Sequence, residues 1–351
     1  MEENIVIHVN VSKPYDVIVG KGLLKKAGEI VKEISQAKTV AIVSDDKVYS
    51  LYGKTVEESL KTSGFSVCAF VFPFGEKSKS FDTYKNAVTF LADKRLSRKD
   101  AVLALGGGVT GDLAGFVSAT YLRGIDYFQF PTTLLSMIDS SVGGKTAIDL
   151  KEGKNLLGAF YQPKKVVIDV NALSTLPDDV YKEGMGEAVK YAFLDKNIFD
   201  LMQEEYSDEE LIALCVKYKA KIVEEDEFES GNRKLLNLGH TVAHGIEKLS
   251  WYKIPHGKAV ALGLKSCVTG AFSRGVISKD YGIGLLEFIE KHSPCGKLPY
   301  SLSDILSESV YDKKRNGNTI DIACFNAVGN VSVKRIELKD VGDYFGESAF
   351  L

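Results

Sequence analysis

The sequence predicts a two-domain protein, with an α/β domain over residues 1–175 and an all-α, mainly helical domain over residues 176–351. In the first half, short apolar segments alternate with helical stretches, a rhythm that indicates a parallel sheet with right-handed crossovers. After Leu176-Pro177-Asp178 the strand-like segments give way to long helical ones. A chain of 351 residues also exceeds one ordinary core and suits about two domains.

The N-terminal half begins with an alternating segment over residues 5–11, typical of a half-buried strand, and a second strand over 15–19 follows the turn at Pro14. Continuous apolar segments predict buried strands over 39–43, 67–72, 101–105, 127–130 and 165–170. Helical patterns fill the stretches between them, over 22–34, 48–63, 80–94 and 113–120.

In the C-terminal half, helical patterns cover residues 179–206, 208–228, 234–250, 258–274 and 280–291. A late alternating segment over 320–333, turning at Gly329-Asn330, predicts a β-hairpin.

Composition excludes several classes of protein. Apolar residues make up 45% and charged residues 26%, which describes a soluble globular protein, and a dispersed net charge of −3 favours no nucleic-acid partner. The five cysteines are far apart and form no C-x-x-C, so we expect reduced thiols. No signal peptide opens the sequence and no apolar segment approaches 18 residues, so we expect a cytoplasmic protein with no membrane partner.

A glycine-rich segment follows the predicted strand at 101–105. Gly106, Gly108 and Gly111 satisfy G-x-G-x-x-G between a strand and a helix, where backbone N–H groups approach a pyrophosphate. This favours a Rossmann-like, dinucleotide-binding domain, although glycine triplets also form plain tight turns. Residues 139–146 end in Gly-Lys-Thr, but Asp139 stands where a P-loop requires glycine. Lys145, Lys154 and Asn155 suit an anionic substrate, and they are equally compatible with an ordinary surface.

Three of the five histidines fall between residues 235 and 260. His240 and His244 are four residues apart and share a helix face, and Glu247 follows three residues later. With His256 returned by a short loop, spacing alone favours an open metal site built on His240 and His244, with Glu247 as a further ligand. The alternative is a helix whose histidines pack or cap.

Several stretches together resemble the 3-dehydroquinate synthase family. They are Phe74 to Lys79, Gly106 to Phe116, Ala119 to Gly124, Pro131 to Leu135, Asp139 to Thr146, Gly153 to Pro163, Gly186 to Tyr191, Arg233 to His244, His256-Gly257 and Asp312 to Lys314. The matching stretches cover most of both domains and occur in the same order as in the family. It implies the dehydroquinate synthase-like fold and a phosphate-eliminating cyclase of the shikimate pathway that uses NAD and Zn²⁺ or Co²⁺. The implied reaction converts 3-deoxy-D-arabino-heptulosonate 7-phosphate (DAHP) to 3-dehydroquinate by transient oxidation, phosphate elimination, re-reduction and aldol closure.

Site residues follow from the resemblance position by position. The metal ligands would be Glu187, His240 and His256, which replaces the set that spacing favours. Phosphate contacts fall to Lys145, Asn155, Asn237, His244 and Lys313 (or Lys314), with Arg123 reaching across a homodimer interface. Lys219 and Arg233 suit the substrate carboxylate, and Asp139 and Lys190 its hydroxyls. NAD contacts fall to Asp45, Phe74, Gly75, Glu76, Lys77, Ser78, Lys79, Gly107, Gly108, Val109, Thr110, Gly111, Asp112, Thr132, Thr133, Lys145, Lys154, Ala172, Leu173, Ser174 and Thr175.

Three positions depart from the family pattern. Lys47 replaces a common Asn, Phe74 lacks the polar character usual in its loop, and Lys258 replaces a usual Glu, which predicts a lower zinc affinity.

Other sugar phosphate cyclases, such as deoxy-inosose or valiolone synthases, are the nearest alternative to this function. A glycerol dehydrogenase-like oxidoreductase and a non-catalytic NAD-binding sensor are more distant ones.

Overall fold

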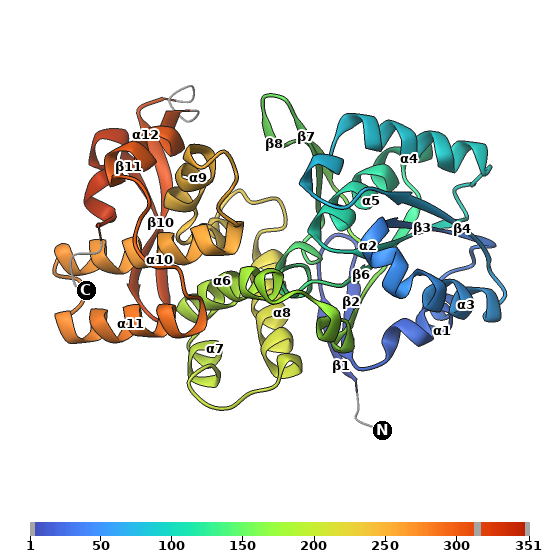
Figure 1. Cartoon of the computed structure of the whole chain (residues 1–351), viewed down its shortest axis with the longest axis horizontal. Coiled ribbons are helices and arrows are strands. Elements are labelled where there is room, and N and C mark those ends of the chain that lie inside the picture. The colour runs from blue at the N-terminus through green and yellow to red at the C-terminus, as the bar shows by residue number, and fades with distance from the viewer. Residues whose placement is uncertain (1–3, 312–316, 348–351) are drawn as a thin grey trace. The chain divides into compact units, whose positions relative to one another are not determined.

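A computed structural model describes residues 4–311 and 317–347 of the chain. The chain folds into two compact units (Figure 1). The first contains residues 1–176 together with 219–224, and the second contains residues 177–218 and 225–351. The predicted boundary at 175/176 lies one residue before the end of the first continuous segment, and sequence reasoning did not anticipate the return of residues 219–224 to the first unit.

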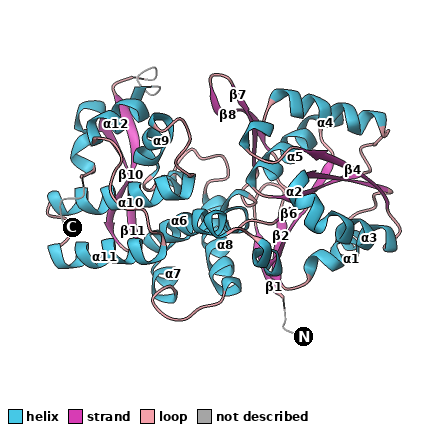
Figure 2. Ribbon diagram, viewed as in Figure 1, coloured by secondary structure: helices cyan, strands magenta, loops and turns pink. Residues whose placement is uncertain are grey.

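The first unit contains a seven-stranded sheet in the order β1-β2-β9-β6-β5-β3-β4. Only the β1–β2 pair is antiparallel, and each of the other neighbouring pairs is parallel. Figure 2 draws the strands in magenta and the helices in cyan. The strands are β1 (Ile5–Val9), β2 (Tyr15–Gly20), β3 (Thr39–Asp45), β4 (Ser66–Phe72), β5 (Ala101–Gly106), β6 (Asp126–Pro131) and β9 (Lys165–Asp169). The predicted α/β fold class is confirmed.

Helices cover both faces of this sheet, because successive strand side chains point to opposite faces. On one face, Val40 and Ile42 of β3 pack in a core with residues of α1 (Ala27–Ile34) and α3 (Lys54–Thr62). On the other face, Ala41 and Val43 pack with residues of α4 (Phe81–Asp93) and α5 (Gly108–Thr120). Burial on both faces explains why the central strands are continuous apolar segments in the sequence.

Three features of the first unit differ from expectation. Helix α5 starts at Gly108, directly after β5, and not at residue 113. The helix expected over 48–63 is divided into α2 (Asp46–Val48), a π-helical turn (Tyr49–Gly53) and α3. A hairpin of β7 (Lys145–Leu150) and β8 (Gly153–Phe160) was not predicted. Glycines around and within these strands weaken the strand pattern in the sequence.

The second unit is mainly helical. Its helices are α6 (Asp178–Leu194), α7 (Lys196–Leu201), most of α8 (Asp208–Glu225), α9 (His240–Leu249), α10 (His256–Ser273), α11 (Lys279–His292) and α12 (Leu302–Tyr311). It is not purely helical, because the predicted late hairpin forms from β10 (Thr319–Ala327) and β11 (Asn330–Glu337). The helix expected over 179–206 breaks at Asp195, which caps α7, and α12 was not expected.

Across residues 4–311 and 317–347, none of the helices combines the length and apolar character needed to cross a membrane.

Candidate active site

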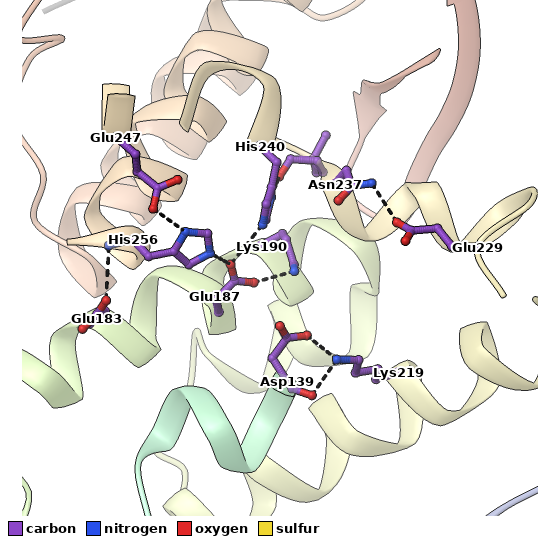
Figure 3. A network of polar contacts seen from close by, with 11 residues as sticks. Asp139, Glu183, Glu187, Lys190, Lys219, Glu229, Asn237, His240, Glu247 and His256 are labelled. Atoms are coloured by element: carbon purple, nitrogen blue, oxygen red, sulfur yellow. Dashed lines mark hydrogen bonds and ion pairs between the residues drawn. The ribbon is translucent and has the colours of Figure 1, made fainter. Parts of the chain in front are cut away.

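Glu187, His240 and His256 meet in the second unit, and each offers one ligand atom within 4.8 Å of the others (Figure 3). Oε1 of Glu187 lies 3.1 Å from Nε2 of His256 and 3.4 Å from Nε2 of His240. The Glu187 side chain is completely buried, whereas the two imidazoles remain partly accessible. Two imidazole nitrogens and one carboxylate oxygen are the donor types that open, catalytic zinc sites use.

Close helix contacts at glycines bring these three ligands together. A Cβ at Gly186 would lie 2.1 Å from the backbone oxygen of Gly257, so α6 and α10 touch backbone to backbone at that point. A Cβ at Gly263 of α10 would lie 2.1 Å from the backbone oxygen of Gly239. Gly186 and Gly239 directly precede Glu187 and His240, and Gly257 follows His256. Each ligand is therefore adjacent to a glycine at a helix contact.

The carboxylates of Glu187 and Glu247 favour a cation in this cluster. Burial lowers the pKa of His240 to about 3, which keeps its imidazole neutral and able to coordinate a metal. Burial also acts to lower the pKa of His256, but its bonds to Glu187 and Glu247 outweigh this effect and raise the pKa to about 10. The buried Lys190 ammonium forms an ion pair with Oε2 of Glu187.

The ligand set that spacing favoured is not the one that the structure gathers. The ring centroids of His240 and His244 are 5.5 Å apart, but the converging donors come from α6, α9 and the start of α10. Glu247 lies on the other side of the His256 ring, 3.2 Å from Nδ1 (Figure 3). Helix spacing alone identifies side chains that share a face, and it does not identify the partner that a neighbouring helix supplies.

Arg233 and Asn237 lie on a 3₁₀ segment (Asn232–Asn237) of the second unit. Arg233 is buried, and its guanidinium donates to the backbone oxygen of Glu227. Asn237 is exposed and donates to Oε1 of Glu229 at 3.2 Å. The carboxylate of Asp226 accepts hydrogen bonds from the backbone N–H groups of residues 230, 231 and 233. These bonds hold the loop that leads into the 3₁₀ segment. Sequence reasoning assigned Asp226 and Glu229 no role, because such loop contacts leave no periodic pattern.

In the first unit, Lys79 is the centre of a buried polar network. Its ammonium donates to Asp112 and to the side-chain oxygen of Asn155. Burial acts to lower the pKa of Lys79, but the Asp112 carboxylate overcomes this effect and raises it, so the ammonium keeps its charge. Asn155 has a left-handed backbone (φ 58°), and its N–H donates to Asp149 at 2.8 Å. Residues expected to contact NAD and substrate phosphate thus share one network.

Asp139 and Lys219 form a second pair in the first unit. Nζ of the buried Lys219 lies 2.7 Å from Oδ1 of Asp139 and also donates to its backbone oxygen (Figure 3). This contact, with the hydrogen bond from the Asn10 N–H to Glu224 at 2.7 Å, joins residues 219–224 of α8 to the first unit. Separation in the sequence concealed the pair.

Except for Lys145 and Lys154, the other residues expected to contact NAD follow the carboxyl ends of the parallel strands. Asp45 ends β3, and its side chain caps α2 through the Val48 N–H at 3.0 Å. Gly107 precedes α5, Thr110 Oγ1 donates to Asp45 at 3.4 Å, and Val109 and Gly111 lie in the first turn of that helix. The remaining predicted residues of this set lie in the loop 74–79, in 132–133 after β6, at Lys154 in β8 (paired with Glu76 at 3.3 Å), and in the 3₁₀ turn 170–175.

Several predicted side chains are exposed. Phe74 is 57% exposed and carries the Lys47 ammonium 3.4 Å from its ring centroid, so two of the departing positions contact each other. Arg123, Lys145 and His244 are also exposed. Lys258 is exposed as well, and solvent screening argues against the expected loss of zinc affinity. Lys313 and Lys314 lie outside the described residues.

Family models cover most of the chain. The model of the 3-dehydroquinate synthase N-terminal region matches residues 69–183, and that of the C-terminal region matches residues 184–315. A 3-dehydroquinate synthase of Clostridium acetobutylicum is 37% identical over 344 residues, covering 94% of this chain and 96% of the relative. One from Desulforamulus reducens is 41% identical over 316 residues, covering 86% and 88%.

Solved structures of sugar phosphate cyclases share the fold. A 2-deoxy-scyllo-inosose synthase, complexed with carbaglucose-6-phosphate, NAD⁺ and Co²⁺, superposes with a TM-score of 0.85 at 23% identity, covering 97% of this chain and 99% of the other. The 2-epi-5-epi-valiolone synthase of Streptomyces hygroscopicus, with NAD⁺ and Zn²⁺ bound, gives 0.84 at 24% identity, covering 95% and 96%. A glycerol dehydrogenase of Schizosaccharomyces pombe gives only 0.64 at 17% identity, covering 93% and 87%.

Proposed function

Because the chain belongs to the 3-dehydroquinate synthase family, we propose that it converts DAHP to 3-dehydroquinate and phosphate, with NAD and a divalent metal as cofactors. The observation that carries this proposal is the convergence of Glu187, His240 and His256 in a chain of this family. Neither a plain helical domain nor a cofactor-free binding protein requires a buried carboxylate facing two imidazoles.

The donor set fits the metal. Nδ1 of His240 lies 3.2 Å from the backbone oxygen of Leu238, and Nδ1 of His256 lies 3.2 Å from Glu247. Both Nδ1 atoms thus have a hydrogen-bond acceptor, which leaves both Nε2 atoms facing Glu187 as ligands. When bound, Zn²⁺ or Co²⁺ would supply a Lewis acid that polarises substrate oxygens. The buried Lys190 ammonium balances the charge of Glu187.

The first unit suits NAD. Glycines 107, 108 and 111 at the start of α5 allow a pyrophosphate to approach backbone N–H groups at the positive end of the helix. Asp45 and Thr110 lie beside this turn, as ribose-binding groups would. When bound, NAD would supply a reversible hydride acceptor that is regenerated in each cycle.

The substrate is a sugar phosphate that also carries a carboxylate, so cations must bind it at both ends. We propose Arg233 and Lys219 for the carboxylate and Asp139 and Lys190 for the hydroxyls. For the phosphate we propose Lys145, Asn155, Asn237, His244, Lys313 and, from the partner of a homodimer, Arg123. Charge-assisted hydrogen bonds from these groups would orient the anion, and held geometry can lower a barrier by roughly 7–11 kcal/mol.

One assay tests the proposal. Purified full-length protein is incubated with DAHP, NAD⁺ and Zn²⁺, while phosphate and NADH are followed together. Phosphate release without net NADH supports the proposed reaction. Net accumulation of NADH would indicate a dehydrogenase. Inactivity on DAHP combined with turnover of glucose 6-phosphate or sedoheptulose 7-phosphate would assign the chain to a sister cyclase activity.

A further inference from the structure

The imidazole of His256 lies between two carboxylates. Its Nε2 is 3.1 Å from Oε1 of Glu187, and its Nδ1 is 3.2 Å from Oε1 of Glu247 (Figure 3). Glu187 belongs to the ligand cluster, whereas Glu247 approaches the opposite ring nitrogen from α9. Glu247 is only 7% exposed, so it is not an ordinary surface acid.

The two histidine ligands have different partners behind them. Nδ1 of His240 faces a neutral backbone oxygen, that of Leu238, at 3.2 Å. Nδ1 of His256 faces a carboxylate instead. A carboxylate behind a metal-bound imidazole fixes its tautomer and raises its basicity more than a neutral acceptor does. The arrangement therefore makes the two imidazoles unequal ligands.

The turn between α9 and α10 holds this contact in place. The backbone oxygen of Glu247 accepts hydrogen bonds from the Tyr252 N–H at 2.7 Å and from the Ser250 hydroxyl at 3.0 Å. The same hydroxyl accepts the Ile254 N–H at 3.3 Å. Glu247 thus bonds the turn through its backbone oxygen and bonds the His256 ring, which follows the turn, through its carboxylate.

We propose that Glu247 is a positioning residue. Its carboxylate accepts the hydrogen bond from Nδ1–H of His256, directs Nε2 toward the metal, and makes His256 the stronger of the two imidazole ligands. The inference rests on the proposed function, because it requires the divalent cation. It also gives Glu247 a different role from the direct ligand that its helix spacing suggests.

The test measures metal affinity in the full-length protein. Wild type, Glu247→Gln and Glu247→Ala are stripped of metal and titrated with Zn²⁺ against a chromophoric chelator, and with Co²⁺ by its visible absorption. Loss of the carboxylate in Glu247→Ala should weaken Zn²⁺ binding by roughly 10- to 100-fold. Glu247→Gln should fall between this variant and wild type, because the amide oxygen still accepts Nδ1–H but carries no charge. The Co²⁺ absorption band should change in the same order.

A matched control separates positioning from the loss of a nearby charge. Glu183 also contacts His256, but Oε1 accepts the backbone N–H, at 3.2 Å, and not a ring N–H. Glu183→Gln should leave the Zn²⁺ affinity within about threefold of wild type and the Co²⁺ spectrum unchanged, because Glu183 accepts the backbone N–H and does not orient the ring. Equal losses in Glu183→Gln and Glu247→Gln would overturn the proposal in favour of a general electrostatic field.

Further outcomes distinguish the inference from the function on which it depends. If wild type binds Zn²⁺ and converts DAHP while Glu247→Ala binds Zn²⁺ as tightly, the positioning role is wrong and the proposed function stands. If wild type binds no divalent cation, the proposed function fails with it. Urea unfolding in the presence of chelator reports on folding, and the Gln variant decides the question if the Ala variant does not fold.

Discussion

At the scale of single residues, the cluster depends on side chains that hold one another in place. His256 has carboxylates at both ring nitrogens, and Glu187 faces two imidazoles and the Lys190 ammonium. None of these contacts is an isolated, exposed ion pair, a kind of contact that adds little to the free energy of unfolding. Removing one member therefore disturbs the others.

Replacing His256 by Ala should abolish turnover of DAHP and leave NAD affinity unchanged, because the lost nitrogen belongs to the second unit and the residues proposed for NAD belong to the first. Phosphate release and equilibrium dialysis of NAD measure the two properties. Lys258→Ala, an exposed change two residues away on the same helix, should keep turnover. Normal turnover by His256→Ala would refute the ligand assignment.

Asp226 makes stability depend on pH in a defined window. Burial acts to raise its pKa, but the backbone N–H groups of Arg233 and Gly231 outweigh burial and lower the pKa from 3.8 to about 2. A carboxyl group whose pKa is lowered by folding stabilises the fold fully above its ordinary pKa. This stabilisation is lost as the pH falls from about 3.8 through about 2. The stability difference between wild type and Asp226→Asn should thus be constant above pH 5 and shrink below pH 4. Urea unfolding of both proteins at pH 6, 4 and 3 checks this, and an unchanged difference at pH 3 contradicts it.

At the scale of elements, helix contacts at glycines matter more than any single helix. The contact between Gly186 of α6 and Gly257 of α10 sets how closely Glu187 and His256 approach each other. The contact between Gly239 and Gly263 does the same for His240. Gly186 and Gly263 are weak helix formers in the interior of α6 and α10, a cost that the close packing offsets.

Gly186→Ala should destabilise the protein by about 1–3 kcal/mol and weaken metal binding, because the new Cβ would overlap the Gly257 backbone oxygen and force α6 and α10 apart. Gly284→Ala on α11 is the control. No atom lies within 4 Å of its added Cβ, so higher helix propensity should stabilise it by roughly 0.5–1 kcal/mol. Thermal unfolding and Zn²⁺ titration measure both variants. Unaltered metal affinity in Gly186→Ala would show that this contact does not set the ligand geometry.

At the scale of the whole molecule, the two cofactors are proposed for different compact units. Removing the metal with a chelator should therefore stop DAHP turnover while changing NAD affinity by less than about threefold, because the residues proposed for NAD belong to the first unit and the metal ligands to the second. Zn²⁺ or Co²⁺ should restore activity. Dialysis of NAD before and after chelation measures this, and release of NAD together with the metal would contradict it.

Local patterns of residues predicted the α/β class, the positions of the central strands, the glycine turn before α5 and the β10–β11 hairpin. These features follow from local rules, since burial on both sheet faces and the backbone freedom of glycine are visible within a few residues. The β7–β8 hairpin was missed because glycines interrupt its alternation. Spacing offered His256 only as a third histidine beside His240 and His244, and resemblance to the family added Glu187 and removed His244 from the set.

Which polar groups meet became visible only in the folded chain. Helix spacing placed Glu247 on the ligand face, and the fold set it behind the His256 ring instead. Asp139 with Lys219, and Lys79 with Asn155, are likewise joined by strands and helices distant in the chain. Convergence of this kind depends on how closely helices and strands pack, a property of their shared contacts that no local pattern of residues encodes.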